Sequence, residues 1–369
     1  MKVAIVHYWL VNMRGGEKVL EALCELYPQA DIFTHVFDPS AIPETIKRHK
    51  ITTTFIQRLP FAHKKYQTYL PLMPLALEQL DLRGYDLVIS SESGPAKGVV
   101  TSPGSLHICY CHTPMRYVWD MYHDYRNQAG WLTAMFMRPL IHYLKIWDFV
   151  SAARVDHFVA NSRFVASRIE KHYRRSADVI YPPVATSDFS VSPEHDDFYL
   201  VVGQLVRYKR VDIAVEACNR LGKRLVVIGD GEALDELRRT AGPNAKILGR
   251  QPFSVIRDHF SRCRALLFPG IEDFGIVPVE AMACGKPVIA FKAGGALETV
   301  IEGTTGVFFE EQTPEALCAA IAWFEAHENS FIPAKIAQHA AQFDKALFKE
   351  RIAALISRKL DEKKQAHTT

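Results

Sequence analysis

Two glutamates, Glu272 and Glu280, lie with seven residues between them in the segment LLFPGIEDFGIVPVEAMACGKPVIA. Each carboxylate accepts hydrogen bonds, so one could hold the hydroxyls of a sugar while the other holds a ribose. The structural alternative is an acidic first turn that only caps a short helix.

The loop between these glutamates is predicted to lead into the amino end of a helix. A strand is expected to end at Phe268, Pro278 suits the first turn of the helix, and Gly285 suits its end. Free backbone N–H groups and the positive end of the helix dipole favour a diphosphate there. A glycine in the loop also lets the backbone come close to the ligand. The expected binding loop is Phe274, Gly275, Ile276 and Val277.

A cluster of cations follows another predicted strand, in the segment VGQLVRYKR that begins at Val202. The carboxyl end of such a strand is the ligand face of an α/β sheet, and we expect Gly203 to border a ligand there. Arg207 and Lys209 could neutralise a leaving diphosphate, with the arginine acting as a bidentate fork. The alternative is a solvated basic turn.

Gly15 and Gly16 follow the first predicted strand and open the first predicted helix, a position suited to the approach of a phosphate or an acceptor. A plain turn explains a Gly-Gly pair equally well. The sequence MRGGE is not G-x-G-x-x-G, and GDGEAL, which begins at Gly229, lacks the third glycine. Binding of a nicotinamide dinucleotide is therefore weakly supported.

His112 ends the predicted strand HICYCH and precedes Thr113 and Pro114. A histidine at the tip of a strand is placed to polarise or hydrogen-bond a bound sugar. The other fourteen histidines are expected mostly at the surface or in the core.

Short strands alternate with helical patterns almost from end to end, which is typical of parallel sheets buried on both faces. The pattern restarts after Tyr181-Pro182-Pro183-Val184, and the polar run that follows makes this the best linker in the chain. Two doubly wound domains are therefore expected, with the ligand between them at the strand ends. The predicted strands are 2–8, 31–37, 86–91, 107–112, 157–162, 198–203, 224–230, 245–249, 265–270, 287–291 and 306–310.

The composition is that of an average globular protein. The 369 residues are 48% hydrophobic and 23% charged, and the net charge of +3 suits an anionic ligand or membrane surface but is too small for nucleic acid. The seven cysteines form no C-x-x-C pair, and the first residues already read as a strand, so a cytoplasmic protein without a signal peptide is expected. The apolar stretch from Trp131 to Val150 contains four charged or histidine side chains and a proline, and is not expected to span a bilayer.

Long runs of the sequence resemble glycosyltransferase family 4, and more narrowly its bacterial O-antigen and exopolysaccharide mannosyltransferases. The likeness covers nearly the whole chain, and the paired glutamates are its most specific part. The runs that carry it are MRGGEKVLEALCELYPQADIFT, HICYCHTPMRYVWDMYHDY, ANSRFVASRI, GQLVRYKRVDIAVEACNRLG, VVIGDGEALDELRRTAGPNAKILGR and FPGIEDFGIVPVEAMACGKPVIAFKAGGALETVIEG.

The resemblance implies a GT-B fold of the α/β class, in which two Rossmann-like domains with doubly wound parallel sheets face one another across a cleft. Residues 1–183 would form the acceptor domain, with a C-terminal helix of about 345–369 packed back on it, and residues 184–344 would form the nucleotide-sugar donor domain.

The resemblance also assigns roles to residues. Glu272 would contact the transferred sugar, Glu280 the nucleotide ribose, and His112 the sugar and the reacting bond. Arg207 and Lys209 would hold the diphosphate, and Arg250 lies where the family approaches the base. Many members have arginine where this chain has Gln204, so charge neutralisation here depends more on Arg207 and Lys209.

The implied reaction retains anomeric configuration and uses no metal or other cofactor, and the sequence contains no Asp-x-Asp that could chelate a cation on a diphosphate. The expected activity is transfer of a hexose, mannose from GDP-mannose, to a glycan or a polyprenyl-diphosphate-linked oligosaccharide in cell-surface polysaccharide synthesis. A UDP-sugar or another nucleotide-sugar donor is the alternative, and so is a nucleotide-sugar epimerase of the same fold. A sugar-binding scaffold without catalysis is a third class, which would tolerate loss of Glu272 and His112.

Two segments mix cations with aromatic residues, Arg58–Tyr66 and Trp131–Trp147. Such segments suit peripheral docking on the inner face of the plasma membrane, close to a lipid-linked acceptor. The alternative is an ordinary core helix with a basic rim.

Overall fold

A computed structural model describes residues 1–120 and 131–368, which divide into two compact units. Unit 1 comprises residues 1–183 and 348–369, and unit 2 comprises residues 184–347. The part of the predicted family segment HICYCHTPMRYVWDMYHDY that follows Asp120 lies outside the described residues.

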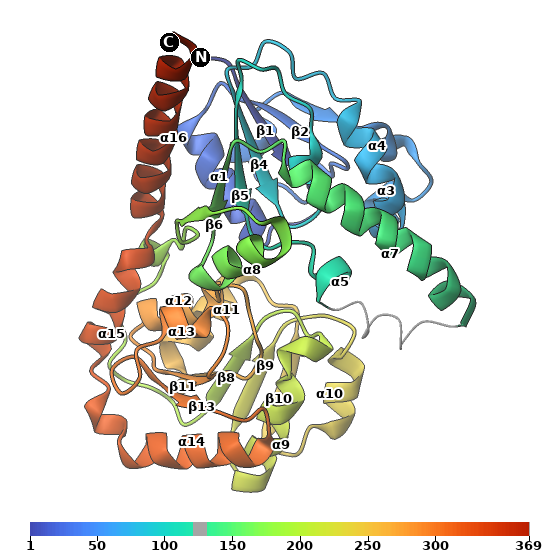
Figure 1. Cartoon of the computed structure of the whole chain (residues 1–369). Helices are drawn as coiled ribbons and strands as arrows, with labels where there is room; N and C mark the ends of the chain where they lie inside the picture. The colour runs from blue at the N-terminus through green and yellow to red at the C-terminus, as the bar shows by residue number, and fades with distance from the viewer. Residues whose placement is uncertain (121–130, 369) are drawn as a thin grey trace. The chain divides into compact units, whose positions relative to one another are not determined.

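Unit 1 is built on a parallel sheet of seven strands in the order β3-β2-β1-β4-β5-β6-β7 (Figure 1). Each strand pairs in parallel with its neighbour because helical or irregular crossovers separate strands that follow one another in sequence. The strands are β1 Val3–His7, β2 Asp31–Thr34, β3 Ile51–Thr53, β4 Leu87–Glu92, β5 Leu106–Cys111, β6 His157–Ala160 and β7 Ala177–Val179.

Alternating side chains of β1 enter two different cores, as the period of a strand requires. Val3 and Ile5 lie in the core that α1 and α16 cover, whereas Ala4 and Val6 lie in the core that α4 and α7 cover. The helices of the unit are α1 Gly15–Leu26, α2 Glu44–Lys47, α3 Ala62–Lys65, α4 Met73–Glu78, α5 Arg116–Trp119, α7 Trp131–Ala152, α8 Arg163–Tyr173 and α16 Lys345–Thr368, with 3₁₀ turns η1 Phe55–Arg58, η2 Tyr66–Leu72 and η3 Ala96–Gly98.

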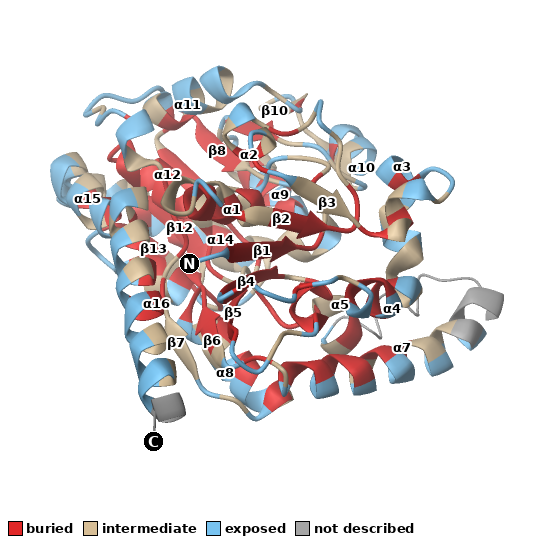
Figure 2. Cartoon of the chain, turned by 90° about the horizontal axis from the view of Figure 1, so that it is seen from above, coloured by how far each residue is buried: buried red, intermediate tan, exposed pale blue. Residues whose placement is uncertain are grey.

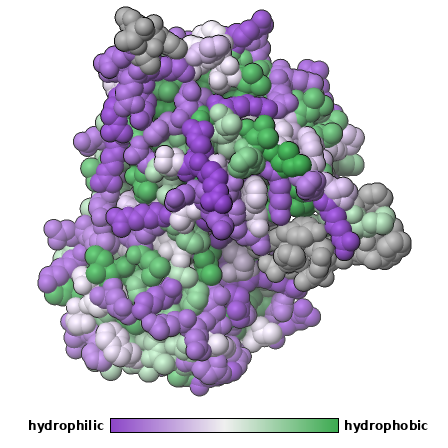
Figure 3. Space-filling view, in the orientation of Figure 1, coloured by the Kyte–Doolittle hydropathy of each residue, from purple (hydrophilic) through white to green (hydrophobic). Residues whose placement is uncertain are grey.

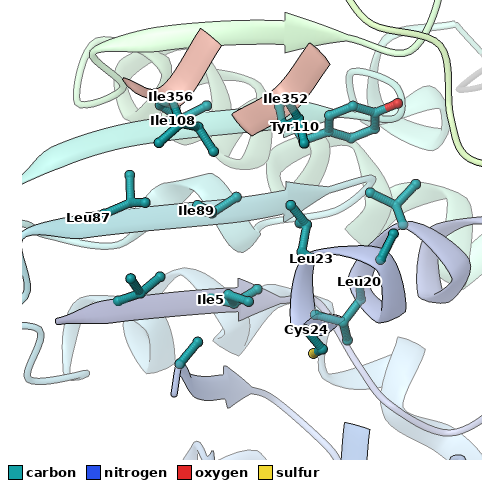
Figure 4. Close-up of a cluster of buried hydrophobic side chains, with 14 of the residues drawn as sticks. Ile5, Leu20, Leu23, Cys24, Leu87, Ile89, Ile108, Tyr110, Ile352 and Ile356 are labelled. Atoms are coloured by element: carbon teal, nitrogen blue, oxygen red, sulfur yellow. The ribbon is translucent and has the colours of Figure 1, made fainter. Parts of the chain in front are cut away.

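The last helix, α16, completes the first of these cores from the far end of the chain. Ile352 and Ile356 are buried in the cluster that holds Leu20 and Leu23 of α1 and residues of β1, β4 and β5 (Figure 4). Polar contacts support the same packing, since Lys349 pairs with Glu25 at 3.1 Å. The strands β1 and β4 are accordingly buried along their length (Figure 2).

Unit 2 repeats the architecture with a six-stranded parallel sheet in the order β10-β9-β8-β11-β12-β13. Its strands are β8 Tyr199–Val202, β9 Leu225–Ile228, β10 Ala245–Gly249, β11 Ala265–Phe268, β12 Val288–Phe291 and β13 Gly306–Phe309. Its helices are α9 Val211–Leu221, α10 Leu234–Thr240, α11 Phe253–Arg262, α12 Ile276–Ala283, α13 Ala296–Thr299, α14 Pro314–Ala326 and α15 Pro333–Ala340, with 3₁₀ turns η4 Thr186–Asp188, η5 Arg207–Lys209, η6 Glu328–Ser330 and η7 Ala341–Phe343.

Both sheets have a point at which the strand order reverses direction, between β1 and β4 in unit 1 and between β8 and β11 in unit 2. The loops that leave neighbouring strands there diverge to opposite faces of the sheet, and the space between them is where doubly wound sheets bind ligands. The predicted α/β fold of two doubly wound parallel sheets is confirmed. Two short edge strands, β3 and β7, were not among the predicted strands.

The apolar stretch that begins at Trp131 forms α7, with Pro139 inside the helix. Within the described residues, no helix is long and apolar enough to cross a membrane.

We predict that Ile352→Ala lowers the free energy of unfolding of unit 1 by about 2–5 kcal/mol, because the buried side chain leaves a cavity between α16 and the sheet. Urea denaturation followed by tryptophan fluorescence measures the change. Arg351→Ala is the matched control, since that neighbouring side chain is exposed and its loss should stay within about 0.5 kcal/mol of the parent. Equal stability of the two variants would show that α16 does not complete this core.

Candidate functional site

In unit 2, an ion pair joins the two loops that leave the point of strand reversal. Lys209 lies in the loop after β8, Glu272 lies in the loop after β11, and Lys209 Nζ is 2.6 Å from Glu272 Oε1. Their side chains are 20% and 21% exposed, so the pair is shielded from water but open on one side. The structure therefore brings together a cation and a carboxylate that the sequence analysis assigned to diphosphate and sugar.

Glycines allow the two loops to come this close. A side chain on Gly270 would place its first carbon 2.7 Å from Lys209 Cα, and one on Gly203 would place it 3.4 Å from Lys209 Nζ. On the other side, Gly295 N–H donates to the Glu272 carbonyl at 2.8 Å, and a Cβ on Gly295 would lie 2.3 Å from Phe274 Cα. The loop that carries Glu272 thus lies between the backbone of the loop after β8 and that of the loop after β12.

Gly203, Lys209, Gly270 and Glu272 line a small pocket of about 20 Å³. That volume holds about one water molecule.

The predicted loop before a helix N-terminus is present. Gly275 is the N-cap of α12 and has a φ of +91°, a left-handed conformation that a side chain would strain. Ile276 and Val277 are the first two residues of the helix, where backbone N–H groups have no partner within the helix. Phe274, which precedes the cap, is buried and packs its ring 5.5 Å from that of Phe343.

The remaining predicted residues of unit 2 lie farther from this pair or face elsewhere. Glu280 is buried in α12, eight positions after Glu272. Arg207 is exposed and lines a separate hollow of about 570 Å³ between α9 and α10, together with Glu236. Arg250 is exposed at the carboxyl end of β10, the edge strand two positions away from β8. Arg207 and Lys209 thus line different hollows, and their predicted joint role on a diphosphate stays a prediction.

The Gly229-Asp230-Gly231 run has a structural role that the sequence analysis missed. A Cβ on Gly229 would lie 1.8 Å from the Gly203 carbonyl oxygen, and one on Gly231 would lie 2.3 Å from that of Leu205. Glycine at these two positions lets this segment pack against the backbone of the loop that leads to Lys209. Their partial likeness to a dinucleotide motif therefore has a packing explanation. Gly270, Gly294 and Gly295 were missed in the same way, and only their closeness to loop ends in the sequence signals them.

In unit 1, Gly16 and His112 lie together beside Tyr8. A Cβ on Gly16 would lie 2.2 Å from Tyr8 Oη and 3.5 Å from His112 Nε2. The Tyr8 ring is buried and contacts the rings of His7 and Trp9, so it has little room to move. Gly15 begins α1 directly before Gly16. Glycine is required at position 16 for this approach of helix, tyrosine and histidine.

His112 is held by neighbours from β4. His112 Nε2 is 2.9 Å from Ser91 Oγ, and its backbone N–H donates to the Glu92 carbonyl at 2.7 Å. Burial lowers the pKa of the His112 imidazole from 6.5 to about 3, and His7 adds to the effect. A neutral imidazole can form hydrogen bonds with hydroxyl groups, as His112 does here with Ser91. It is a poor general acid at neutral pH.

A buried pair next to this group was not predicted. His7 ends β1 and its Nε2 lies 3.7 Å from Glu17 Oε1, with both side chains almost completely buried. Glu17 also accepts from the backbone N–H of Arg14 at 2.9 Å, which fixes the start of α1. Among the residues that the structure describes, neither ring nitrogen of His7 has a hydrogen-bond partner. A histidine at the tip of a strand was the available signal, and the sequence analysis used it for His112 only.

Among the residues that the structure describes, no group of three or more histidine, cysteine, aspartate or glutamate side chains is arranged to hold a metal ion.

The two doubly wound parallel sheets have the GT-B fold. The chain matches the family described as Glycosyltransferase Family 4 over residues 13–188 and the family described as Glycosyl transferases group 1 over residues 185–346. Together the two matches run from residue 13 to residue 346, one in each half of the chain.

Curated relatives match at modest identity. An uncharacterized glycosyltransferase of Methanocaldococcus jannaschii is 30% identical over 195 residues, which is 52% of this chain and 55% of that protein. The alpha-1,3/1,6-mannosyltransferase ALG2 of Dictyostelium discoideum is 25% identical over 53% of this chain and 56% of its own. A GDP-mannose-dependent phosphatidylinositol monomannoside mannosyltransferase of Mycolicibacterium smegmatis is 28% identical over 43% and 50%. The chain thus spans about half the length of the curated relatives it matches.

Solved structures share the fold over nearly the whole chain. HepE of Anabaena, solved with UDP-glucose, has a TM-score of 0.71 at 19% identity and covers 97% of this chain and 100% of its own. Sucrose-phosphate synthase of Thermosynechococcus elongatus has a TM-score of 0.75 at 17% identity, covering 98% and 100%. At these identities the likeness establishes the GT-B fold.

We predict that the His112 imidazole stays neutral above about pH 5, because its pKa in the folded protein is about 3. Since this value lies below that of the unfolded chain, the stability from the neutral ring is complete above about pH 6.5 and is lost as the pH falls toward 3. An NMR titration of the imidazole nitrogens measures it, with the His112→Gln spectrum as the assignment control. A midpoint near 6 would contradict the burial argument.

Proposed function

We propose that the chain is a glycosyltransferase that moves a hexose from a nucleoside-diphosphate sugar to a hydroxyl of a glycan or of a polyprenyl-diphosphate-linked oligosaccharide. The observation that carries the proposal is the Lys209–Glu272 pair at the strand reversal of unit 2, next to the amino end of α12. A cation and helix N–H groups suit a diphosphate, and a carboxylate at the same place suits sugar hydroxyls.

Mannose from GDP-mannose is the donor that we propose. Two of the relatives are named as mannosyltransferases, and one of these is named as GDP-mannose-dependent. Their matches cover about half of each chain. We also propose a role in cell-surface polysaccharide synthesis and a cytoplasmic location, which the seven unpaired cysteines support.

In the proposed reaction, the bond between the anomeric carbon and the β-phosphate oxygen breaks while the acceptor oxygen bonds to the same face of the sugar. The acceptor proton passes to the departing phosphate, so configuration is retained without an enzyme nucleophile. Lys209 and the N–H groups at the start of α12 would stabilise the charge that grows on the phosphate. Arg207 would join them on donor binding, and no metal would be needed.

The other proposed roles concern the sugar and the nucleoside. Glu272 would accept from sugar hydroxyls, Glu280 from the ribose, and Arg250 would lie near the base. His112, as a neutral ring, would hydrogen-bond the donor sugar instead of serving as an acid.

We predict that Lys209→Ala lowers turnover about a hundredfold or more, because the leaving phosphate loses a preorganised cation. Initial rates with saturating donor and a mannosyl acceptor measure the effect. Lys246→Ala is the control, since Lys246 is an exposed lysine on β10 and its removal should leave the rate unchanged. Near-normal turnover of Lys209→Ala would rule out this role for the ion pair.

We predict that GDP-mannose raises the melting temperature of the chain more than UDP- or ADP-sugars, and that EDTA leaves turnover unchanged. A ligand at a hundred times its dissociation constant adds about 2.7 kcal/mol to the stability of the folded state. Thermal-shift screening measures the preference, and product analysis identifies the reaction. A UDP-sugar as the best ligand would replace the donor. A changed sugar still joined to its nucleotide would indicate an epimerase, and loss of activity in EDTA would contradict the metal-free mechanism.

A further inference from the structure

One face of α7 exposes large apolar side chains to solvent over most of the helix. Met135, Tyr143, Ile146, Phe149 and Val150 are each between 45% and 53% exposed. Successive members of this set lie eight, three, three and one residues apart, which keeps all five within about a third of the circumference of a helix. Figure 2 shows the exposed edge of α7 opposite its buried edge, and Figure 3 shows hydrophobic surface over its C-terminal half.

The opposite face of α7 is fixed in the core, so the exposed side chains cannot turn inward. Ile141, Leu144 and Trp147 are buried against residues of α4 and of the sheet. Asp148 is completely buried and accepts hydrogen bonds from Trp119 Nε1 at 2.7 Å and from Tyr173 Oη at 2.8 Å. Buried Lys97 also pairs with Asp148 and, at 3.3 Å, with Glu92. A helix held by such a network presents its outer face rigidly.

The charges on the exposed face are of one sign. Arg138 is exposed on it, and His142 is exposed one turn further along. From Met135 to Ala152 the only acidic residue is Asp148, whose carboxylate is buried against Lys97. The outer face of α7 is therefore apolar and basic, without an exposed carboxylate.

The neighbouring segment has the same character. The short helix α4 packs beside α7, since Trp147 Nε1 and Arg154 donate to Glu78 at 3.1 and 2.6 Å. Leu72, which directly precedes this helix, and Leu75, which lies within it, are exposed. In and before α3, Phe61 is the most exposed large apolar residue among those described, and exposed Lys64 and Lys65 follow it.

We propose that the outer face of α7, together with the exposed residues of α3 and α4, docks on an anionic lipid surface. Apolar side chains would enter the boundary between headgroups and acyl chains, and the cations would contact anionic headgroups. A second copy of the chain fits less well, because a symmetric dimer brings the same patch against itself, and the one exposed carboxylate among the described residues of α3, α4 and α7, that of Glu78, is already paired with Arg154. The inference does not depend on the proposed function, since lipid binding needs neither donor nor acceptor.

The test is co-sedimentation of the full chain with vesicles of phosphatidylcholine alone and of phosphatidylcholine mixed with phosphatidylglycerol. We expect binding to the anionic vesicles, weakening with added salt. Phe149→Glu should weaken this binding by about tenfold or more, because the phenyl ring that would insert into the lipid is lost and a negative charge is added. Phe253→Glu is the matched control: Phe253 of α11 in unit 2 is 45% exposed where Phe149 is 46% exposed, and its variant should bind like the parent.

Three results would overturn the proposal. These are no binding to anionic vesicles, equal binding to both compositions, and unchanged binding of Phe149→Glu. Sedimentation velocity tests whether the chain forms a dimer through this face. If Phe149→Glu dissociates a dimer and lipid has no effect, this face is a contact between two copies of the chain and the proposal is wrong. Circular dichroism and melting temperature verify that both variants fold, and Arg138→Glu gives a second variant that changes charge alone. Donor hydrolysis in detergent-free solution is measured separately, so failure of docking and failure of the proposed activity are distinguishable.

Discussion

The contact between Lys209 and Glu272 exists because two neighbouring parallel strands send their loops to opposite faces of one sheet. The strands β8 and β11 are adjacent in the sheet, but their crossovers leave in different directions, and the loops can meet only at the carboxyl edge. Three glycines shape the loops that form this contact. Gly270 removes the side chain that would separate the loops, Gly295 holds the Glu272 carbonyl, and Gly275 turns the chain into α12. The position of the ion pair thus depends on the close approach of the backbone at Gly270 and Gly295.

Much of this could be predicted from the sequence. The strand after which each charged residue falls, the helix that begins next to Gly275 and the reversal of strand order all follow from hydrophobic runs and turn residues. Lys209 and Glu272 could each be placed after a strand of the second domain, but their contact with each other was not predicted. Distances of that kind depend on which glycines face which backbone, as at Gly229 and Gly203, and a sequence does not contain that information locally.

The unpredicted parts each have a physical cause. The strands β3 and β7 are three residues long and only partly buried, so they lack the long apolar run by which an interior strand is recognised. Arg207 faces a different hollow from Lys209 because a 3₁₀ turn separates neighbouring side chains by about a third of a revolution. His7 and Glu17 come together because β1 and α1 pack across an intervening loop, and neither residue type favours burial.

The chain crosses from unit 1 to unit 2 at Pro183 and returns at Leu347, and the two ends of unit 2 are fastened to each other. Val184 N–H donates to the Phe343 carbonyl and Lys345 N–H donates to the Val184 carbonyl, both at 3.0 Å. Unit 2 is thus a closed insertion between two parts of unit 1. During synthesis almost all of unit 2 emerges before α16, so until then the face of the unit 1 sheet that α1 and α16 share is covered by α1 without α16. The last helix of the chain, α16, therefore completes the core of unit 1, whose other elements all lie in the first half of the sequence.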